Sequence, residues 1–209
     1  MMSKALSILL LIISPLVNFG QDWKSLDAGD KVLEDLKSSL ASMESIRGDL
    51  RQEKSFAFLN DKLISRGLFV YRKEDKLRWE FSDPIEYIIL INENSMRLKE
   101  EGEEKKYKGM NQILRQVKEI ILGCIDGSVM SNSNYKTSFS TNGKGVRIQL
   151  APKAKSLKEF IQQIEVEFSI KGSTLQKVTL TDPSGDLTDI FFSNVKSNEQ
   201  INESVFTQF

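Results

Sequence analysis

The chain of 209 residues contains no histidine and only one cysteine, Cys124. Without histidine, neither a serine nor a cysteine nucleophile can be paired with an imidazole base. A zinc site would lack the imidazole and thiolate ligands that zinc favours, and a single cysteine excludes an intrachain disulfide. We therefore expect no enzyme, no cofactor and no metal site.

An excess of charge of one sign is also missing, because 29 basic residues face 29 acidic ones. Nucleic-acid-binding proteins usually carry a basic field, so no nucleic-acid partner is expected. Hydrophobic residues make up 40% of the chain and charged residues 28%, which is typical of a globular protein. The length suits one domain, and no repeat, linker or low-complexity segment divides the chain.

Long hydrophobic runs are absent except near the N-terminus. Residues 1–4 carry one positive charge, and residues 5–13 are almost entirely apolar. Such a run is too short to span a bilayer and has the pattern of a secretory signal peptide. We predict that residues 1–20 are cleaved after Gly20, which leaves a soluble single domain over residues 21–209. The alternatives are an N-terminal membrane anchor and an uncleaved helix.

Hydrophobic periodicity predicts two helices and about ten strands in the remaining chain. Helical spacing covers residues 28–43 and 111–125, and residues 126–134 leave room for a further helical turn. Strands are predicted at residues 46–53, 64–72, 77–81, 86–92, 96–99, 135–140, 146–150, 160–170, 175–181, 187–196 and 205–209. Short turns separate most of them, which favours antiparallel pairing. The predicted fold is α+β and mostly β: a strongly curved antiparallel sheet, or incomplete barrel, with helices against it.

Three consecutive predicted strands share one apolar face, because alternate residues of a strand point the same way. After Gly67, this face carries eight large side chains: Phe69, Tyr71, Leu77, Trp79, Phe81, Tyr87, Ile89 and Ile91. A curved sheet must cover such a face, either with its own side chains or with a ligand. We expect these eight residues to line a lipid-binding hydrophobic cavity, and the alternative is a filled core.

The end of the second predicted helix is the expected lid over this cavity. It runs from Ile120 to Ile125, and the expected lid residues are Ile121, Leu122, Gly123, Cys124 and Ile125. Gly123 lowers helix stability by about 1 kcal/mol relative to alanine, which would ease a hinge, and Cys124 is expected to be a small buried hydrophobic residue. The ordinary alternative is a buried helix packed permanently on the sheet.

Lys73 stands at the end of the apolar face, in phase with Phe69 and Tyr71. We expect its ammonium group to donate hydrogen bonds to carbonyl groups of the lid helix and to act as a gate. A lysine would hold carbonyls less specifically than the fork of an arginine. The alternative is a hairpin lysine in solvent.

Several segments together carry a family pattern. They are residues 52–54 (Gln-Glu-Lys), 65–71 (Ser-Arg-Gly-Leu-Phe-Val-Tyr), 77–84 (Leu-Arg-Trp-Glu-Phe-Ser-Asp-Pro), 150–153 (Leu-Ala-Pro-Lys), 160–170 and 205–209. In these segments the sequence resembles the outer-membrane lipoprotein carrier (LolA-like) family. The resemblance extends from Leu26 to Phe209, and Leu-Arg-Trp-Glu followed by proline is its most specific part.

The resemblance implies a periplasmic carrier that shields the acyl chains of lipoproteins and ferries them from the inner to the outer membrane. It implies acylated lipoproteins as cargo, an inner-membrane ABC transporter as donor and an outer-membrane acceptor, and we expect a monomer. The family's gating arginine would fall at Lys73, and the proline after it at Glu74. A Leu77→Glu substitution is expected to abolish lipid binding or release while the fold stays intact.

Three other functions stay open on the sequence alone. The chain could carry another lipid or a glycolipid on the same fold, or it could be a lipid-sensing periplasmic interaction module. The third is a hydrolase that uses Asp182, Asp186 and Asp189, since neighbouring carboxylates can perform acid–base chemistry. Aspartates in turns are far more often solvated caps, so the hydrolase is the least favoured.

Overall fold

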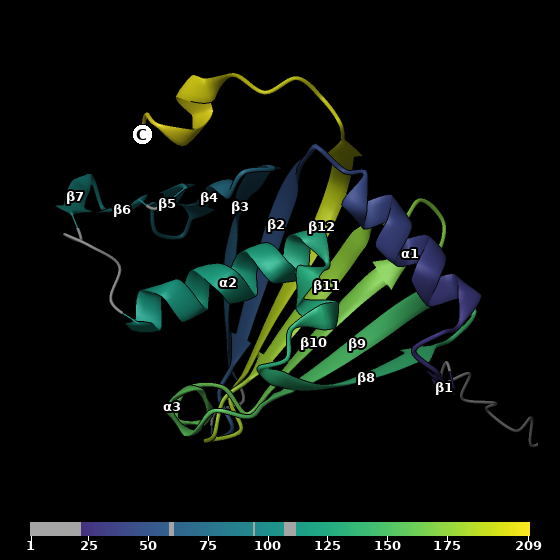
Figure 1. The fold of residues 1–209 in the computed structure, drawn as a ribbon. Helices are drawn as coiled ribbons and strands as arrows, with labels where there is room; N and C mark the ends of the chain where they lie inside the picture. Colours follow the sequence, from purple (N-terminus) through teal and green to yellow (C-terminus); the bar gives the residue numbers. More distant parts are fainter. Residues whose placement is uncertain (1–21, 59–60, 94, 107–111) are drawn as a thin grey trace, which may run out of the picture.

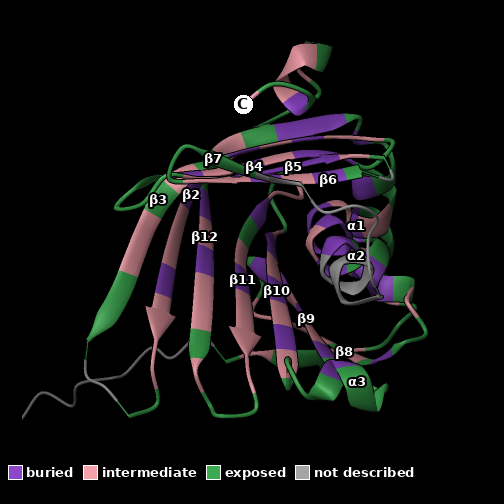
Figure 2. Cartoon of the chain, turned by 90° about the vertical axis from the view of Figure 1, so that its left-hand side faces the viewer, coloured by how far each residue is buried: buried purple, intermediate pink, exposed green. Residues whose placement is uncertain are grey.

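A single antiparallel sheet of twelve strands curves around two helices that lie on its concave side (Figures 1 and 2). The strand order is β1-β8-β9-β10-β11-β12-β2-β3-β4-β5-β6-β7. This computed structural model describes residues 22–58, 61–93, 95–106 and 112–209. The predicted fold class, a mostly β protein with an open curved sheet, is confirmed, and the predicted signal peptide at residues 1–20 lies outside the described residues.

The elements follow the chain in short succession. The strands are β1 (Lys24–Leu26), β2 (Ser45–Ser55), β3 (Lys62–Arg72), β4 (Lys76–Asp83), β5 (Tyr87–Asn92), β6 (Ser95–Glu100), β7 (Glu103–Lys106), β8 (Tyr135–Thr141), β9 (Gly145–Pro152), β10 (Gln163–Ser169), β11 (Leu175–Thr181) and β12 (Leu187–Ser197). The helices are α1 (Lys31–Ala41), α2 (Gln112–Asp126) and α3 (Lys155–Lys158). Two 3-10 turns, η1 (Ser128–Ser131) and η2 (Glu203–Phe206), complete the fold.

The apolar residues whose spacing predicted the helices are buried in α1 and in the second half of α2. Leu33, Leu36 and Leu40 of α1 are buried at helical spacing, and the second half of α2 buries Ile120 and Ile125. Figure 2 shows both helices enclosed between strands β3–β7, which turn across the top, and strands β8–β12. The concave face of the sheet and the two helices therefore share one hydrophobic core.

The apolar face predicted on β3, β4 and β5 forms in the expected register. Phe69 pairs with Trp79, which in turn pairs with Ile89. Tyr71, Leu77 and Ile91 form the adjacent row, and Gly67, Phe81 and Tyr87 form the row on the other side. Because each row joins three strands, the face is continuous across the sheet.

Gly67 marks an irregularity where β3 and β4 come very close. The register of the β3–β4 ladder shifts between Arg66 and Gly67. A Cβ atom at position 67 would lie 1.7 Å from the backbone oxygen of Glu80. Only glycine can occupy this point without moving one of the two strands.

The predicted strand at residues 205–209 is wrong, because this segment begins in the 3-10 turn η2. The side chain of Asn202 accepts a hydrogen bond from the N–H of Ser204 at 3.0 Å and so caps the turn. The segment then lies on the convex side of the sheet, over β4 and β5 (Figure 1). Arg78 donates to the carbonyl of Gln208 at 2.7 Å, and Arg97 donates to that of Thr207 at 2.6 Å. Arginine side chains therefore donate to carbonyl groups of this segment. In a strand, these carbonyl groups would accept hydrogen bonds from the backbone of a neighbouring strand.

The two edge strands were not predicted, and one predicted strand begins later than expected. The edge strands β1 and β7 have three and four residues, which is too short for an alternating pattern to show. The strand predicted at residues 160–170 begins only at Gln163. The N–H groups of Phe160 and Ile161 bond to the carbonyl of Leu157 at the end of α3, so these two residues close a helical turn.

Candidate functional site

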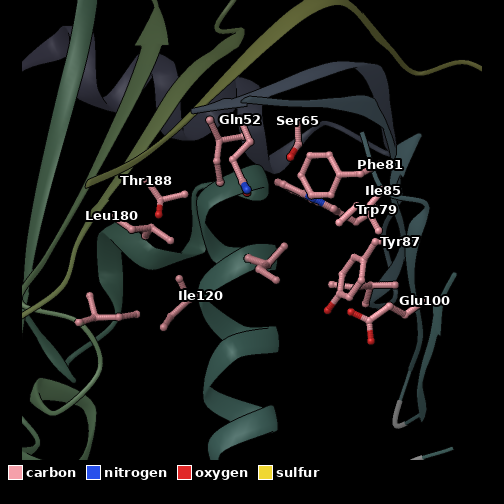
Figure 3. Close-up of a pocket in the computed structure, with 14 residues that line it drawn as sticks. Gln52, Ser65, Trp79, Phe81, Ile85, Tyr87, Glu100, Ile120, Leu180 and Thr188 are labelled. Carbon is pink, nitrogen blue, oxygen red and sulfur yellow. The ribbon is translucent and has the colours of Figure 1, made fainter. Parts of the chain in front are cut away.

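A cavity of about 470 Å³ lies between α2 and the concave face of the sheet (Figure 3). Its lining is mostly aliphatic and aromatic: Gln52, Ser65, Trp79, Phe81, Ile85, Tyr87, Ile89, Glu100, Ile120, Ile121, Ile161, Leu180, Thr188 and Ile190. Volume and lining are those of a site for a small apolar ligand. Glu100 is the one charged residue among these fourteen.

A smaller void of about 40 Å³ continues this cavity beneath α2. It shares Trp79, Ile120 and Ile121 with the main cavity and adds Cys124 and Ile125, among other residues. All of its lining residues are apolar. A movement of α2 away from the sheet would therefore enlarge an already apolar space.

The eight residues predicted to line the cavity divide into two groups. Trp79, Phe81, Tyr87 and Ile89 line the cavity. The other four, Phe69, Tyr71, Leu77 and Ile91, lie in the core and do not line it. The structure thus places one half of the apolar face at the cavity and the other half in packed core.

An aromatic cluster fixes the wall of the cavity. The ring of Phe192 packs edge-on against Phe69 and against Trp79, with centroid distances of 5.1 and 6.1 Å. Phe69 and Trp79 are themselves 6.5 Å apart. Contacts of this kind are favourable beyond simple burial, so the core residue Phe69 helps to position the cavity residue Trp79.

The predicted lid residues all lie on α2, but they do not share one environment. Ile121 lines the main cavity together with Ile120, the first residue of the expected lid segment. Cys124 and Ile125 line the smaller void, and Leu122 is buried. Gly123 lies against η1, because a Cβ there would be 3.2 Å from the Cβ of Val129.

The thiol of Cys124 sits under α2 with 3% of its surface exposed. Burial, and secondarily the negative charge of Asp126, raises the pKa of Cys124 to about 12. The protonated thiol is the stable form in this position, in line with a small hydrophobic residue rather than a reactive one.

Lys73 contacts α1 and not the lid residues of α2. Its Nζ donates to the carbonyl of Ala41 at 2.8 Å, at the end of α1, and to Glu44 Oε1 at 2.7 Å. Its backbone N–H also donates to the carbonyl of Glu44 at 2.9 Å. Lys73 thus joins the β3–β4 hairpin to the C-terminal end of α1, and its role as a gate stays a prediction.

A second lysine, which the sequence analysis missed, holds α2. Lys118 is 8% exposed, and its Nζ lies 2.6 Å from Asp75 Oδ2 and 2.7 Å from the carbonyl oxygen of Glu93. The signal in the sequence was its position, since Lys118 precedes Ile121 by three residues and therefore falls on the apolar stripe. An ammonium group on the buried side of a helix needs hydrogen-bond partners, and the tips of two hairpins provide them.

Tyr71 makes a further polar contact to α2. Its hydroxyl group donates to Asp126 Oδ2 at 3.3 Å. Burial raises the pKa of Tyr71 well above its ordinary value, with the charge of Asp126 adding to the effect. The hydroxyl therefore stays protonated and available as a donor.

The carboxylates considered for acid–base chemistry lie outside the cavity lining. Asp182 accepts hydrogen bonds from the N–H groups of Ser184 and Asp186 and so caps its own turn. Asp189 accepts from Thr179 at 2.6 Å and pairs with Lys177. Within the described part of the chain, no group of three or more acidic or cysteine side chains could hold a metal ion.

No helix in the described ranges has both the length and the apolar character needed to cross a membrane.

Comparisons with known proteins agree with the sequence resemblance. The family model of the outer membrane lipoprotein carrier protein LolA matches residues 41–208. The chain is 23% identical over 183 residues to an outer-membrane lipoprotein carrier protein of Cupriavidus pinatubonensis, covering 83% of this chain and 81% of that one. It is 27% identical over 176 residues to an outer-membrane lipoprotein carrier protein of Legionella pneumophila strain Corby, and the match covers 83% of this chain and 83% of that one. Among solved structures, a LolA superfamily protein from Nitrosomonas europaea matches with a TM-score of 0.44 at 8% identity, over 85% of this chain and 96% of that one.

Proposed function

The chain belongs to the LolA family of outer membrane lipoprotein carrier proteins, and from this premise we propose that it carries lipoproteins across the periplasm from the inner to the outer membrane. The cavity of about 470 Å³ between α2 and the sheet is the observation that supports this proposal. Each methylene group removed from water contributes about 0.8 kcal/mol. Acyl chains therefore need a shielded apolar space during transit, and this cavity supplies one.

The helix α2 is the proposed lid. Ile120 and Ile121 form one wall of the cavity, and Cys124 and Ile125 cover the void beneath. When an acyl chain displaces these residues from the sheet, it is buried against apolar side chains. When the residues pack against the sheet again, they close the cavity and favour release of the chain. Loading and unloading then differ by the position of one helix.

Two lysines are proposed to control that position. Lys118 fixes α2 to the tips of two hairpins, and Lys73 fixes α1 to the β3–β4 hairpin. The β3–β4 hairpin thus contacts both helices, through Asp75 on one side and Lys73 on the other. A shift of this hairpin would therefore change the position of both helices that cover the concave face, α1 and α2.

The mouth of the cavity is the proposed contact surface for donor and acceptor. Five large apolar side chains that are exposed to solvent lie at the end of the sheet where β2, β4 and β11 end: Phe58, Leu63, Ile85, Phe160 and Leu187. Ile85 also lines the cavity. Exposed apolar residues around a ligand site often mark an interaction surface. We propose that an inner-membrane ABC transporter and an outer-membrane acceptor bind there in turn, each to a monomer of this carrier.

The pattern of the N-terminal sequence supports a location in the periplasm. We propose that residues 1–20 are a cleaved signal peptide that directs export of residues 21–209. The mature chain would then meet lipoproteins only after they have crossed the inner membrane.

Native mass spectrometry of the protein purified from the periplasm, followed by lipid extraction, tests the function. A co-purifying acylated lipoprotein is the expected result. A bound lipid without a protein moiety would move the function to another lipid cargo. An empty protein that also fails to take up a fluorescent acyl probe would contradict the carrier function itself.

A further inference from the structure

Three polar side chains interrupt the apolar lining on one wall of the cavity. They are Gln52 on β2, Ser65 on β3 and Thr188 on β12, and all three are half-buried. In Figure 3, Gln52 and Ser65 lie next to each other at one end of α2, and Thr188 lies beside Leu180. The rest of this wall consists of side chains such as Ile190 and Leu180.

The sheet register brings these three residues together. Strands β12, β2 and β3 are adjacent in the sheet. Gln52 pairs directly with Ser65 across β2 and β3. On the other side Gln52 pairs with Ile190, and Thr188 lies two residues from Ile190 on the same face of β12. Gln52 and Ser65 are therefore direct cross-strand neighbours, and Thr188 lies diagonally across from Gln52, so that the three side chains form a polar band on three adjacent strands.

Within the described part of the chain, none of the three side chains forms a hydrogen bond or an ion pair. The Gln52 amide offers two donors and an acceptor, and each hydroxyl group can donate and accept. No buried side-chain nitrogen or oxygen in the described part of the chain lacks a partner, so these three unpaired groups remain accessible from the open space of the cavity. Their donors and acceptors face the cavity and are free to pair with a ligand.

Charge is nearly absent from the same space. Glu100 lies with Tyr87 on the other side of the cavity (Figure 3). Lys54, the next residue on the Gln52 face of β2, is not part of the lining, and its Nζ lies 5.1 Å from the centre of the Phe56 ring. A bound phosphate would meet one carboxylate and no cation among the lining residues.

Given the proposed function, we propose that Gln52, Ser65 and Thr188 bind the uncharged ester and amide groups that join acyl chains to the head of a phosphate-free lipid. The chains lie among Trp79 and the isoleucines of α2, and the linkage is held at the band. Ester carbonyls accept hydrogen bonds from Gln52 and the two hydroxyl groups. An amide N–H donates to the oxygen of Gln52 or of either hydroxyl.

The test compares lipids of equal chain length in displacement of an apolar fluorescent dye. The probes are monolaurin, a synthetic diacylglyceryl-cysteine peptide, phosphatidylglycerol and the plain hydrocarbon dodecane. The variants are the wild type, Q52L/S65A/T188V, and Q176L as a matched control on the exposed surface of β11. Thermal unfolding of each variant confirms its fold, and the single variants S65A and T188V replace the triple variant if it unfolds.

The expected result is a loss of affinity that is confined to lipids with a polar linkage. The triple variant should bind monolaurin and the lipopeptide at least about tenfold more weakly, and each single variant about threefold to fivefold more weakly. Dodecane should bind all variants equally, and phosphatidylglycerol should bind the wild type more weakly than the lipopeptide does. Equal affinity of wild type and triple variant for monolaurin would overturn the proposal, as would preferential binding of phosphatidylglycerol. In either case the carrier function survives if acyl chains still bind, whereas a wild type that binds no chain at all contradicts both.

Discussion

The ammonium group of Lys118 lies 2.6 Å from the carboxylate of Asp75, and this contact joins α2 to the sheet from the buried side of the helix. The same ammonium donates to the carbonyl of Glu93 at 2.7 Å. The two hairpin tips are also joined to each other, since the N–H of Glu93 donates to the carbonyl of Asp75 at 3.1 Å. One side chain of the lid helix therefore holds two turns at once.

The substitution Lys118→Met should loosen α2 without unfolding the protein. Methionine keeps the apolar stem, and Asp75 is half-exposed, so the carboxylate that loses its partner returns to water. We expect a loss of about 2 kcal/mol in the free energy of unfolding and faster uptake of a fluorescent acyl probe in stopped-flow mixing. Lys31→Met, which removes an exposed pair with Asp35, is the control and should change neither quantity. An uptake rate like that of the wild type would exclude Lys118 as a latch.

Cys124 provides a direct measure of the position of α2. With a pKa of about 12, roughly one thiol in ten thousand is ionised at pH 8. Alkylation by iodoacetamide should therefore be very slow in the folded protein and fast after denaturation. Binding of an acyl chain under α2, or the Lys118→Met substitution, should accelerate it. Mass spectrometry of the alkylated protein over time gives the rate, and a ligand-bound protein with unchanged protection would show that α2 stays in place.

The apolar face of β3, β4 and β5 could be predicted from the sequence because its causes are local. The period of two fixes which residues share a face, and short turns fix the register. Phe69, Trp79 and Ile89 accordingly form one row across three strands.

The division of that face into cavity and core could not be predicted in the same way. It depends on where α2 crosses the sheet, and that position rests on contacts between residues far apart in the chain. Lys118 bonds to Asp75 and Glu93, which precede it by 43 and 25 residues. The prediction of a strand at residues 205–209 was wrong for a similar reason. The carbonyl groups of this segment accept hydrogen bonds from Arg78 and Arg97, which are more than 100 residues away in the sequence.

The substitution Gly67→Ala should destabilise the fold strongly. The new methyl group would lie 1.7 Å from the backbone oxygen of Glu80, so β3 and β4 must separate. We expect a loss of about 3 kcal/mol or more, which is at the upper end for overpacked sites, and a lower melting temperature in calorimetry. Gly29→Ala is the matched control because no atom lies within 4 Å of its added Cβ. Equal melting temperatures for the two variants would contradict the close approach of the strands.

A glutamate in place of Ile121 should impair ligand binding without unfolding the protein, whereas a glutamate in place of Leu77 should not allow the two effects to be distinguished. Leu77 is fully buried, so Leu77→Glu leaves a carboxylate in the core and should unfold the protein, contrary to the expectation from sequence alone. Ile121 is half-exposed and lines the cavity, so Ile121→Glu should keep the fold and weaken acyl-probe binding at least about tenfold. Circular dichroism and probe titration of both variants measure the two effects. A folded Leu77→Glu variant, or full binding by Ile121→Glu, would contradict the assignment of cavity and core.

Glu203 should make the attachment of the C-terminal segment dependent on pH. Hydrogen bonds from Lys76 and then from Arg72 hold the pKa of Glu203 below its ordinary value of 4.5. Because the folded pKa is the lower one, the stabilisation is fully present above pH 4.5 and is lost as the pH falls through the folded value. Glu203→Gln should therefore lower the free energy of unfolding at pH 7, and the difference from the wild type should shrink as the solution is acidified below pH 4.5. Glu159→Gln, at an exposed residue with no ion pair in the described part of the chain, is the control. Urea unfolding at a series of pH values measures the difference, and one that stays constant down to pH 2 would rule out this ion-pair network as its source.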